Sequence, residues 1–156
     1  MKYQTGDIIV TRSKQWYWNV SPGYWNHVGM FVEIDAKQFV IEALPFYGVI
    51  LIPAKMFFAR DQIYKVLRHK PDDQGPESKY SIIPYFAAHR ALKDLGKSYS
   101  LLGVFRRRNC VSLVRNSYQC ITGKRLPWIV PDDLFRDMEK THFQIIFDSE
   151  KENHET

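Results

Sequence analysis

The sequence predicts an α+β domain in which an antiparallel sheet of five to six strands, or a small barrel, comes first and helices follow. Five short apolar or alternating runs, each bounded by turn residues, occupy the first half of the chain. Helical spacing of apolar residues begins only after residue 81. Between the two halves, residues 71–78 are polar and rich in Pro, Gly and Asp. That composition indicates a surface connection.

The expected strands form a continuous antiparallel meander or a small barrel. They cover residues 8–11, 27–33, 39–43, 48–52 and 62–68. The second and third runs should pair as a hairpin, because residues 34–38 hold a turn between them. Pro53 ends the fourth run, and the residues that follow it to position 58 form a turn or a short helix.

Helices are expected in the second half. Residues 82–95 have helical spacing, with Pro84 tolerated in the first turn and Gly96 ending the helix. A second helix begins at Cys110. Residues 131–138 start a third, with acidic residues at its positive end.

The chain is expected to end in a last strand at residues 142–147 and a polar, frayed tail at residues 148–156. Its 156 residues suffice for one domain, residues 1–156, with a buried core. A hydrophobic content of 45% and a charged content of 25% are ordinary for a globular protein. No apolar run approaches the roughly 20 residues that span a bilayer, and residues 1–7 lack the apolar core of a signal peptide. A cytoplasmic protein is therefore expected.

The net charge of +5 reflects 22 Lys and Arg against 17 Asp and Glu. The densest basic segments are residues 106–108 and 124–125, at opposite ends of the helix that begins at Cys110. A solvated basic edge explains them, and anionic lipid or nucleic acid is the alternative partner.

Cys110 stands at the start of its helix. Asn109 is a good N-cap, and Gly123 occupies the position of a left-handed C-cap. Unpaired backbone N–H groups, the helix dipole and the nearby arginines all favour an anion at Cys110. A thiolate there would be a nucleophile if a base and an orienting group lie beside it. The alternative is a small buried residue without chemistry.

The buried face of this helix is predicted from the three-and-four spacing of its apolar residues. These residues are Val111, Val114, Tyr118 and Ile121. Cys120 lies ten residues after Cys110, about 15 Å along a helix, so a disulfide between them is excluded and both should be reduced. The two cysteines also lack metal-ligand spacing, and neither a metal nor a cofactor is expected.

A histidine and a carboxylate can meet on the predicted hairpin. In a strand, His27 and Gly29 share one face. If the register sets Glu42 opposite Gly29, Glu42 becomes the diagonal neighbour of His27, and the glycine leaves room for the carboxylate to lean towards the imidazole. A slip of one residue would place Glu42 on the other face. His27 could instead be a structural histidine, with His89 as the substitute base.

Aromatic residues crowd the segment between the first two predicted strands. Trp16, Trp18 and Trp25 lie there, with Pro22-Gly23 indicating a loop. Such a loop can wall a hydrophobic substrate groove or touch a membrane interface, and plain packing over the core is the alternative.

The order of these segments resembles a known family. His27-Val28-Gly29-Met30 comes first, Val40-Ile41-Glu42-Ala43 follows, and Asn109-Cys110-Val111-Ser112-Leu113-Val114 comes much later. This order resembles the YiiX-type branch of the NlpC-like, papain-related cysteine hydrolases, in which the chain is circularly permuted. The opening Gly6-Asp7-Ile8-Ile9 and the stretch from Leu95 to Tyr99 are similar to the same family.

The resemblance implies a permuted papain-like fold, with Cys110 as the nucleophile, His27 as the general base and Glu42 as the group that orients the imidazole. Imidazole titrates near neutrality and can carry the proton between thiol and leaving group. The implied substrates are peptide or amide bonds or lipid acyl groups. Tyr99 and Arg108 precede the cysteine and join Trp16, Trp18 and Trp25 as candidate substrate-binding residues.

The sequence therefore predicts a cysteine hydrolase, a peptidase or amidase, or an acyltransferase. The first alternative is a non-catalytic lipid- or acyl-group-binding protein of the same fold, in peripheral contact with a membrane. The second, less favoured, is a nucleic-acid-binding module that uses residues 106–108, whose binding would weaken steeply with salt. The sequence does not determine the oligomeric state.

Overall fold

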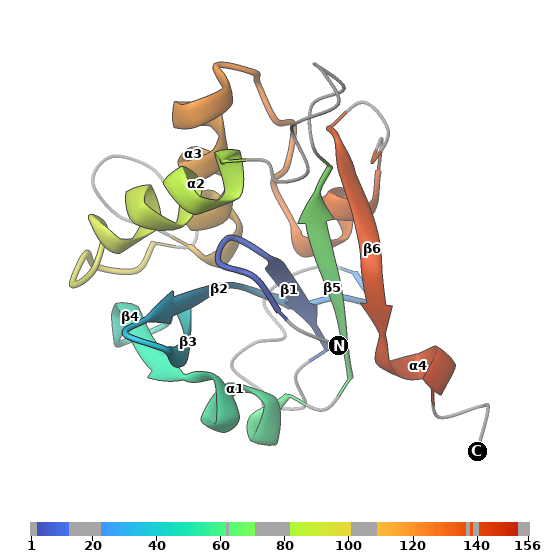
Figure 1. Cartoon of the computed structure of the whole chain (residues 1–156), viewed down its shortest axis with the longest axis horizontal. Helices are drawn as coiled ribbons and strands as arrows, with labels where there is room; N and C mark the ends of the chain where they lie inside the picture. The colour runs from blue at the N-terminus through green and yellow to red at the C-terminus, as the bar shows by residue number, and fades with distance from the viewer. Residues whose placement is uncertain are drawn as a thin grey trace.

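The computed structural model describes residues 3–12, 23–61, 63–70, 82–100, 109–136, 138 and 141–152. They form an α+β structure around one six-stranded antiparallel sheet (Figure 1). The strands are β1 (Ile8–Thr11), β2 (His27–Ile34), β3 (Lys37–Leu44), β4 (Gly48–Pro53), β5 (Tyr64–His69) and β6 (Phe143–Asp148). The predicted α+β fold class is confirmed.

The expected continuous meander is wrong beyond β4. The strand order is β4-β3-β2-β1-β5-β6, so the chain meanders through the first four strands and then returns to pair β5 with the other edge of β1. The composition of β1 explains this return. All four of its residues are buried, and such a strand left at a sheet edge would expose an unpaired backbone to water.

Helices cover both faces of the sheet. Figure 1 shows α2 (Ile83–Leu92) beside α3 (Cys110–Thr122) on one side and α1 (Ala54–Arg60) on the other. Successive side chains of β1 point to opposite faces of the sheet. Ile8 and Val10 therefore join the larger core under α2 and α3, and Ile9 joins the smaller core under α1.

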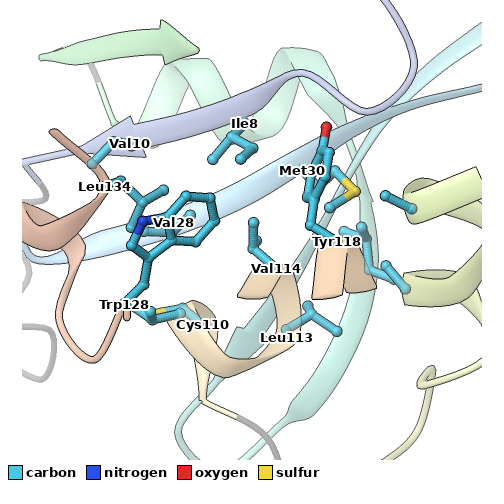
Figure 2. Close-up of a cluster of buried hydrophobic side chains, with 14 of the residues drawn as sticks. Ile8, Val10, Val28, Met30, Cys110, Leu113, Val114, Tyr118, Trp128 and Leu134 are labelled. Carbon is cyan, nitrogen blue, oxygen red and sulfur yellow. The ribbon is translucent and has the colours of Figure 1, made fainter. Parts of the chain in front are cut away.

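The larger core is built around α3. Figure 2 shows Leu113, Val114 and Tyr118 of α3 among side chains of β1 and β2, with Cys110 at the same cluster. The burial that was predicted for the helix face ends at Tyr118, whose hydroxyl donates to the Gly6 carbonyl at 2.6 Å. Ile121, one turn later, is 37% exposed, so its predicted burial is wrong.

The C-terminal region differs from expectation in two places. The helix expected over residues 131–138 is only the short 3₁₀ helix η2 (Pro131–Phe135). The Asp133 carboxylate accepts the backbone N–H groups of Ile129 and Val130, at 2.8 and 3.0 Å, which closes a tight turn in place of a longer helix. Where a frayed tail was expected, Ser149–Glu152 forms the short helix α4, and the Ser149 hydroxyl accepts the Tyr64 N–H at 2.9 Å.

No helix in the described part of the chain is both long and apolar enough to cross a lipid bilayer.

Candidate active site

The β2–β3 register brings His27 and Glu42 together. Gly29 is paired with Glu42, which is the register that the sequence-based hypothesis requires. His27 Nε2 donates to Glu42 Oε2 at 2.6 Å, and both side chains are fully buried. A hydrogen bond to an ionised group this short is among the strong ones in proteins.

Gly29 makes room for side chains that pack against the β2–β3 hairpin. A Cβ at Gly29 would lie 2.6 Å from Val40 Cγ1 and 3.1 Å from Phe57 Cε2. The space is therefore taken by Phe57 of α1, whose ring centroid lies 6.1 Å from that of His27. The glycine lets an apolar ring cover the imidazole.

Cys110 reaches the histidine from the opposite layer. It is 8% exposed at the first residue of α3, and its side chain lies near enough to the His27 imidazole to affect the pKa of that ring. Burial lowers the pKa of His27, but side-chain hydrogen bonds and charges of Cys110 and Glu42 outweigh burial and raise that pKa from 6.5 to about 9. The imidazole is therefore protonated at neutral pH.

The start of α3 is fixed as predicted. Asn109 has an extended backbone, and its Oδ1 accepts the Ser112 N–H at 2.6 Å. Ser112 Oγ accepts the Asn109 N–H at 2.9 Å, which completes a capping box. These bonds occupy the Ser112 N–H, and the Leu113 N–H donates to the Asn109 carbonyl. The Cys110 and Val111 N–H groups precede the bonded part of the helix.

Sequence reasoning missed Arg60. This last residue of α1 donates from Nη1 to Glu42 Oε1 at 3.0 Å and from Nη2 to Glu42 Oε2 at 2.7 Å. It also pairs with Asp61, Nε to Oδ2, at 3.0 Å. A carboxylate in an apolar strand demands a cationic partner, which is a signal in the sequence. The sequence predicts His27 as the partner of Glu42. The position of Arg60 in the sequence does not indicate a contact with β3.

The predicted substrate-binding residues have different surroundings. Tyr99 lies near Cys110: burial raises the pKa of Tyr99 and the charge of Cys110 raises it further, to about 12. Trp25 is 6% exposed and packs in the core against Phe135, with ring centroids 5.5 Å apart. Trp16, Trp18 and Arg108 lie outside the described residues. His89, the substitute base, lies on α2 against Tyr85.

A pocket of about 420 Å³ adjoins Tyr99. The β3–β4 turn forms one wall, where Phe46 and Tyr47 are 92% and 73% exposed. The pocket is lined by Pro45, Phe46, Tyr47, Gly48, Gly96, Ser98 and Tyr99. Because β3 ends and β4 begins here, the pocket lies at the end of the sheet that carries His27.

The fold and this cluster define a class of protein. A thiol at a helix start, an imidazole and an orienting carboxylate form the arrangement that papain-like proteins use, with the sheet here preceding the helix in the chain. The chain belongs to the permuted papain-like amidase enzymes of the YaeF/YiiX, C92 family, whose family model matches residues 2–129. The suspected family is thus confirmed, and with it a hydrolase of the amidase type.

Among solved structures, the metalloprotein YiiX from Escherichia coli O157:H7 is similar to this chain. The TM-score is 0.65 at 28% sequence identity, over 81% of this chain and 70% of that one. A comparison with curated proteins finds no match. The solved relative is described as a metalloprotein. In the described ranges of this chain, no three or more His, Cys, Asp or Glu side chains are grouped so that they could hold a metal ion.

Proposed function

We propose that the protein is a cysteine-dependent amidase or peptidase in which Cys110 is the nucleophile, His27 the general base and Glu42 the residue that orients the imidazole. The observation that carries the proposal is the buried hydrogen bond from His27 to Glu42 at the end of the sheet, with the buried Cys110 near enough to raise the pKa of His27. Cys110 and Glu42 each favour the protonated imidazole, as a thiolate–imidazolium pair requires.

The proposed reaction proceeds through an acyl-enzyme. The Cys110 sulfur attacks the carbonyl carbon of the substrate, and the C–N bond breaks as His27 gives its proton to the leaving nitrogen. Water then attacks the thioester carbonyl, His27 takes up the proton of that water, and the C–S bond breaks, which releases the acid and restores the Cys110 thiolate beside protonated His27. The Cys110 and Val111 N–H groups at the start of α3 are suited to bind the developing oxyanion.

Glu42 supports the reaction without reacting. It holds Nε2 of His27, which directs the other ring nitrogen away from the carboxylate. Its negative charge also stabilises the imidazolium that forms when the thiol loses its proton.

The experiment that tests the proposal is a search for the covalent acyl-enzyme. The protein is incubated with amino-acyl and fatty-acyl 4-nitroanilides, and its intact mass and released nitroaniline are followed. We expect an adduct of one acyl group that maps to Cys110 and is absent from Cys110→Ala but present in Cys120→Ala. Nitroaniline release that persists in Cys110→Ala would contradict the proposal.

A second candidate function is non-catalytic binding of a lipid or acyl group. The exposed Phe46 and Tyr47 beside the pocket at Tyr99 favour it. It predicts that Cys110→Ala binds fatty-acyl ligands as well as the wild type does, and that no acyl group is transferred to sulfur. Equilibrium binding of a fluorescent fatty acid to both proteins separates the two functions.

A further inference from the structure

Glu42 serves two cations with the same oxygen. Its Oε2 accepts from His27 Nε2 at 2.6 Å and from Arg60 Nη2 at 2.7 Å, and its Oε1 accepts from Arg60 Nη1 at 3.0 Å. The guanidinium fork fits a carboxylate in a single orientation. Arg60 therefore fixes the rotamer in which Glu42 accepts the hydrogen bond from His27.

The same contacts keep Glu42 charged. A fully buried carboxylate takes up a proton unless cations hold it ionised. Burial raises the pKa of Glu42, but hydrogen bonds and charges of His27, and then of Arg60, outweigh burial and lower it. Arg60 remains charged when His27 has lost its proton, so Glu42 keeps one cationic partner throughout a reaction cycle.

Asp61 balances the charge of Arg60. Its Oδ2 lies 3.0 Å from Arg60 Nε and 2.9 Å from Arg60 Nη2, and the side chain is fully buried. Leaving the Cys110 thiolate aside, the two carboxylates of Glu42 and Asp61 match the two cations of His27 and Arg60 when His27 is protonated. Without Asp61, the charge of Arg60 would repel the imidazolium across Glu42.

We propose that Arg60 and Asp61 form a charge-balanced positioning pair for the candidate active site: Arg60 holds Glu42 ionised and limits how tightly that carboxylate retains the proton on His27, and Asp61 prevents Arg60 from repelling the imidazolium. The catalytic meaning of the pair rests on the proposed function, because His27 must release its proton to a leaving group.

The pair acts on His27 through Glu42. Among the described residues, the charged and titratable neighbours of His27 include Glu42 from β3 and Cys110 from α3, with Arg60 and Asp61 behind Glu42. Phe57 of α1 covers the ring without a charge, and the Arg60 guanidinium lies 5.0 Å from the centre of that phenyl ring.

The proposed pair predicts shifts of opposite sign in the pKa of His27 for two variants. Arg60→Met removes a cation and should raise the pKa of His27 further, by roughly one pH unit, because a charge within about 6 Å shifts a pKa by that order. Asp61→Asn removes an anion at nearly constant shape and should lower the pKa of His27, by less because Asp61 lies one contact further away. If the pair only anchored α1 to the sheet, both variants would lose stability and neither would move the titration.

The test is an NMR titration of the His27 ring protons, assigned by their loss in His27→Gln, in wild type, Arg60→Met, Arg60→Lys and Asp61→Asn. Arg60→Lys keeps the charge and should titrate closer to wild type than Arg60→Met does. Arg68→Met is the matched control, since Arg68 pairs with the buried Asp7 through the same two-pronged contact, at 2.7 and 2.8 Å. It should lose stability and leave His27 unchanged.

An unchanged His27 titration in both Arg60→Met and Asp61→Asn, or shifts of the same sign, would overturn the inference. If Arg60→Met does not fold, the Asp61→Asn shift and the Arg60→Lys comparison decide it. The titration needs no substrate and no turnover. Opposite shifts without any acyl-enzyme would therefore uphold the electrostatic pair and overturn only the proposed function.

Discussion

Glu42 Oε2 lies 2.6 Å from His27 Nε2 because β2 and β3 pair Glu42 with Gly29, two residues along the strand from the histidine. This diagonal placement puts both side chains on one face, where long side chains on neighbouring strands can meet. Arg60 then holds the carboxylate from the far side. The candidate active site depends on this relationship.

Glu42→Gln should be strongly destabilising. The change preserves shape but removes the carboxylate that pairs with both His27 and Arg60, and breaking a buried charge pair costs roughly 3–5 kcal/mol in the free energy of unfolding. Loss of the anion should also lower the pKa of His27. Urea denaturation and an NMR titration measure the two effects. Glu33→Gln on the exposed end of β2 is the control and should change stability by less than about 0.5 kcal/mol.

Gly29→Ala should destabilise the protein by about 1–3 kcal/mol, because its Cβ would overlap Val40 and press on Phe57. The ring of Phe57 must then move away from His27. Gly96→Ala is the comparison, since Gly96 has a positive φ of 78° but no atom within 4 Å of a new Cβ. It measures backbone strain alone. If Gly29→Ala unfolds with the same free energy as the wild type and leaves the His27 signal unchanged, Gly29 is not packed as described.

Asn109→Ala should remove the N-cap of α3 and cost about 1 kcal/mol, the usual value for losing such a cap. Because Cys110 is the next residue, the variant should also lower the rate at which this thiol is alkylated. Thermal denaturation and site-resolved alkylation check both effects. Asn116→Ala, within the same helix but away from its start, should leave the alkylation rate unchanged.

The protonation of His27 should make stability depend on pH in a defined window. Its pKa is raised in the folded protein, from 6.5 to about 9, so the stabilisation is complete below pH 6.5 and is lost as the pH rises through about 9. Glu42 acts in the opposite direction. Its pKa is lowered in the folded protein, so its contribution to stability is present above pH 4.5 and is lost on acidification. Unfolding free energies of wild type and His27→Gln should converge at alkaline pH. A constant difference between them from neutral to alkaline pH would contradict the assigned pKa of His27.

Much of this arrangement could be predicted from local sequence. The N-cap Asn109, the C-cap Gly123 and the two strands β2 and β3 each follow from short-range rules, and the structure has all of them. The register of Glu42 against Gly29 was one of two open alternatives. It is selected by the burial of Val40 and Phe31 under α1, a tertiary effect outside the hairpin.

The remaining features depend on contacts between distant segments. Arg60 reaches Glu42 only because α1 folds across the face of β3, and a seven-residue helix carries little sequence signal of its own. Trp25 was a candidate for a substrate groove, yet Asp132 of η2 accepts its backbone N–H at 3.1 Å and draws the indole into the core. The return of β5 to β1 likewise joins residues that are more than fifty positions apart.

The most direct test of the central claim is the pH dependence of iodoacetamide labelling at Cys110 and Cys120 in wild type and His27→Ala, resolved by mass spectrometry. Cys120 is exposed and serves as the internal control in the same chain. The account predicts that Cys110, although buried, labels faster than Cys120 below about pH 8, and that His27→Ala abolishes this advantage. If Cys110 labels no faster than Cys120, and His27→Ala changes nothing, the thiolate–imidazolium pair does not exist.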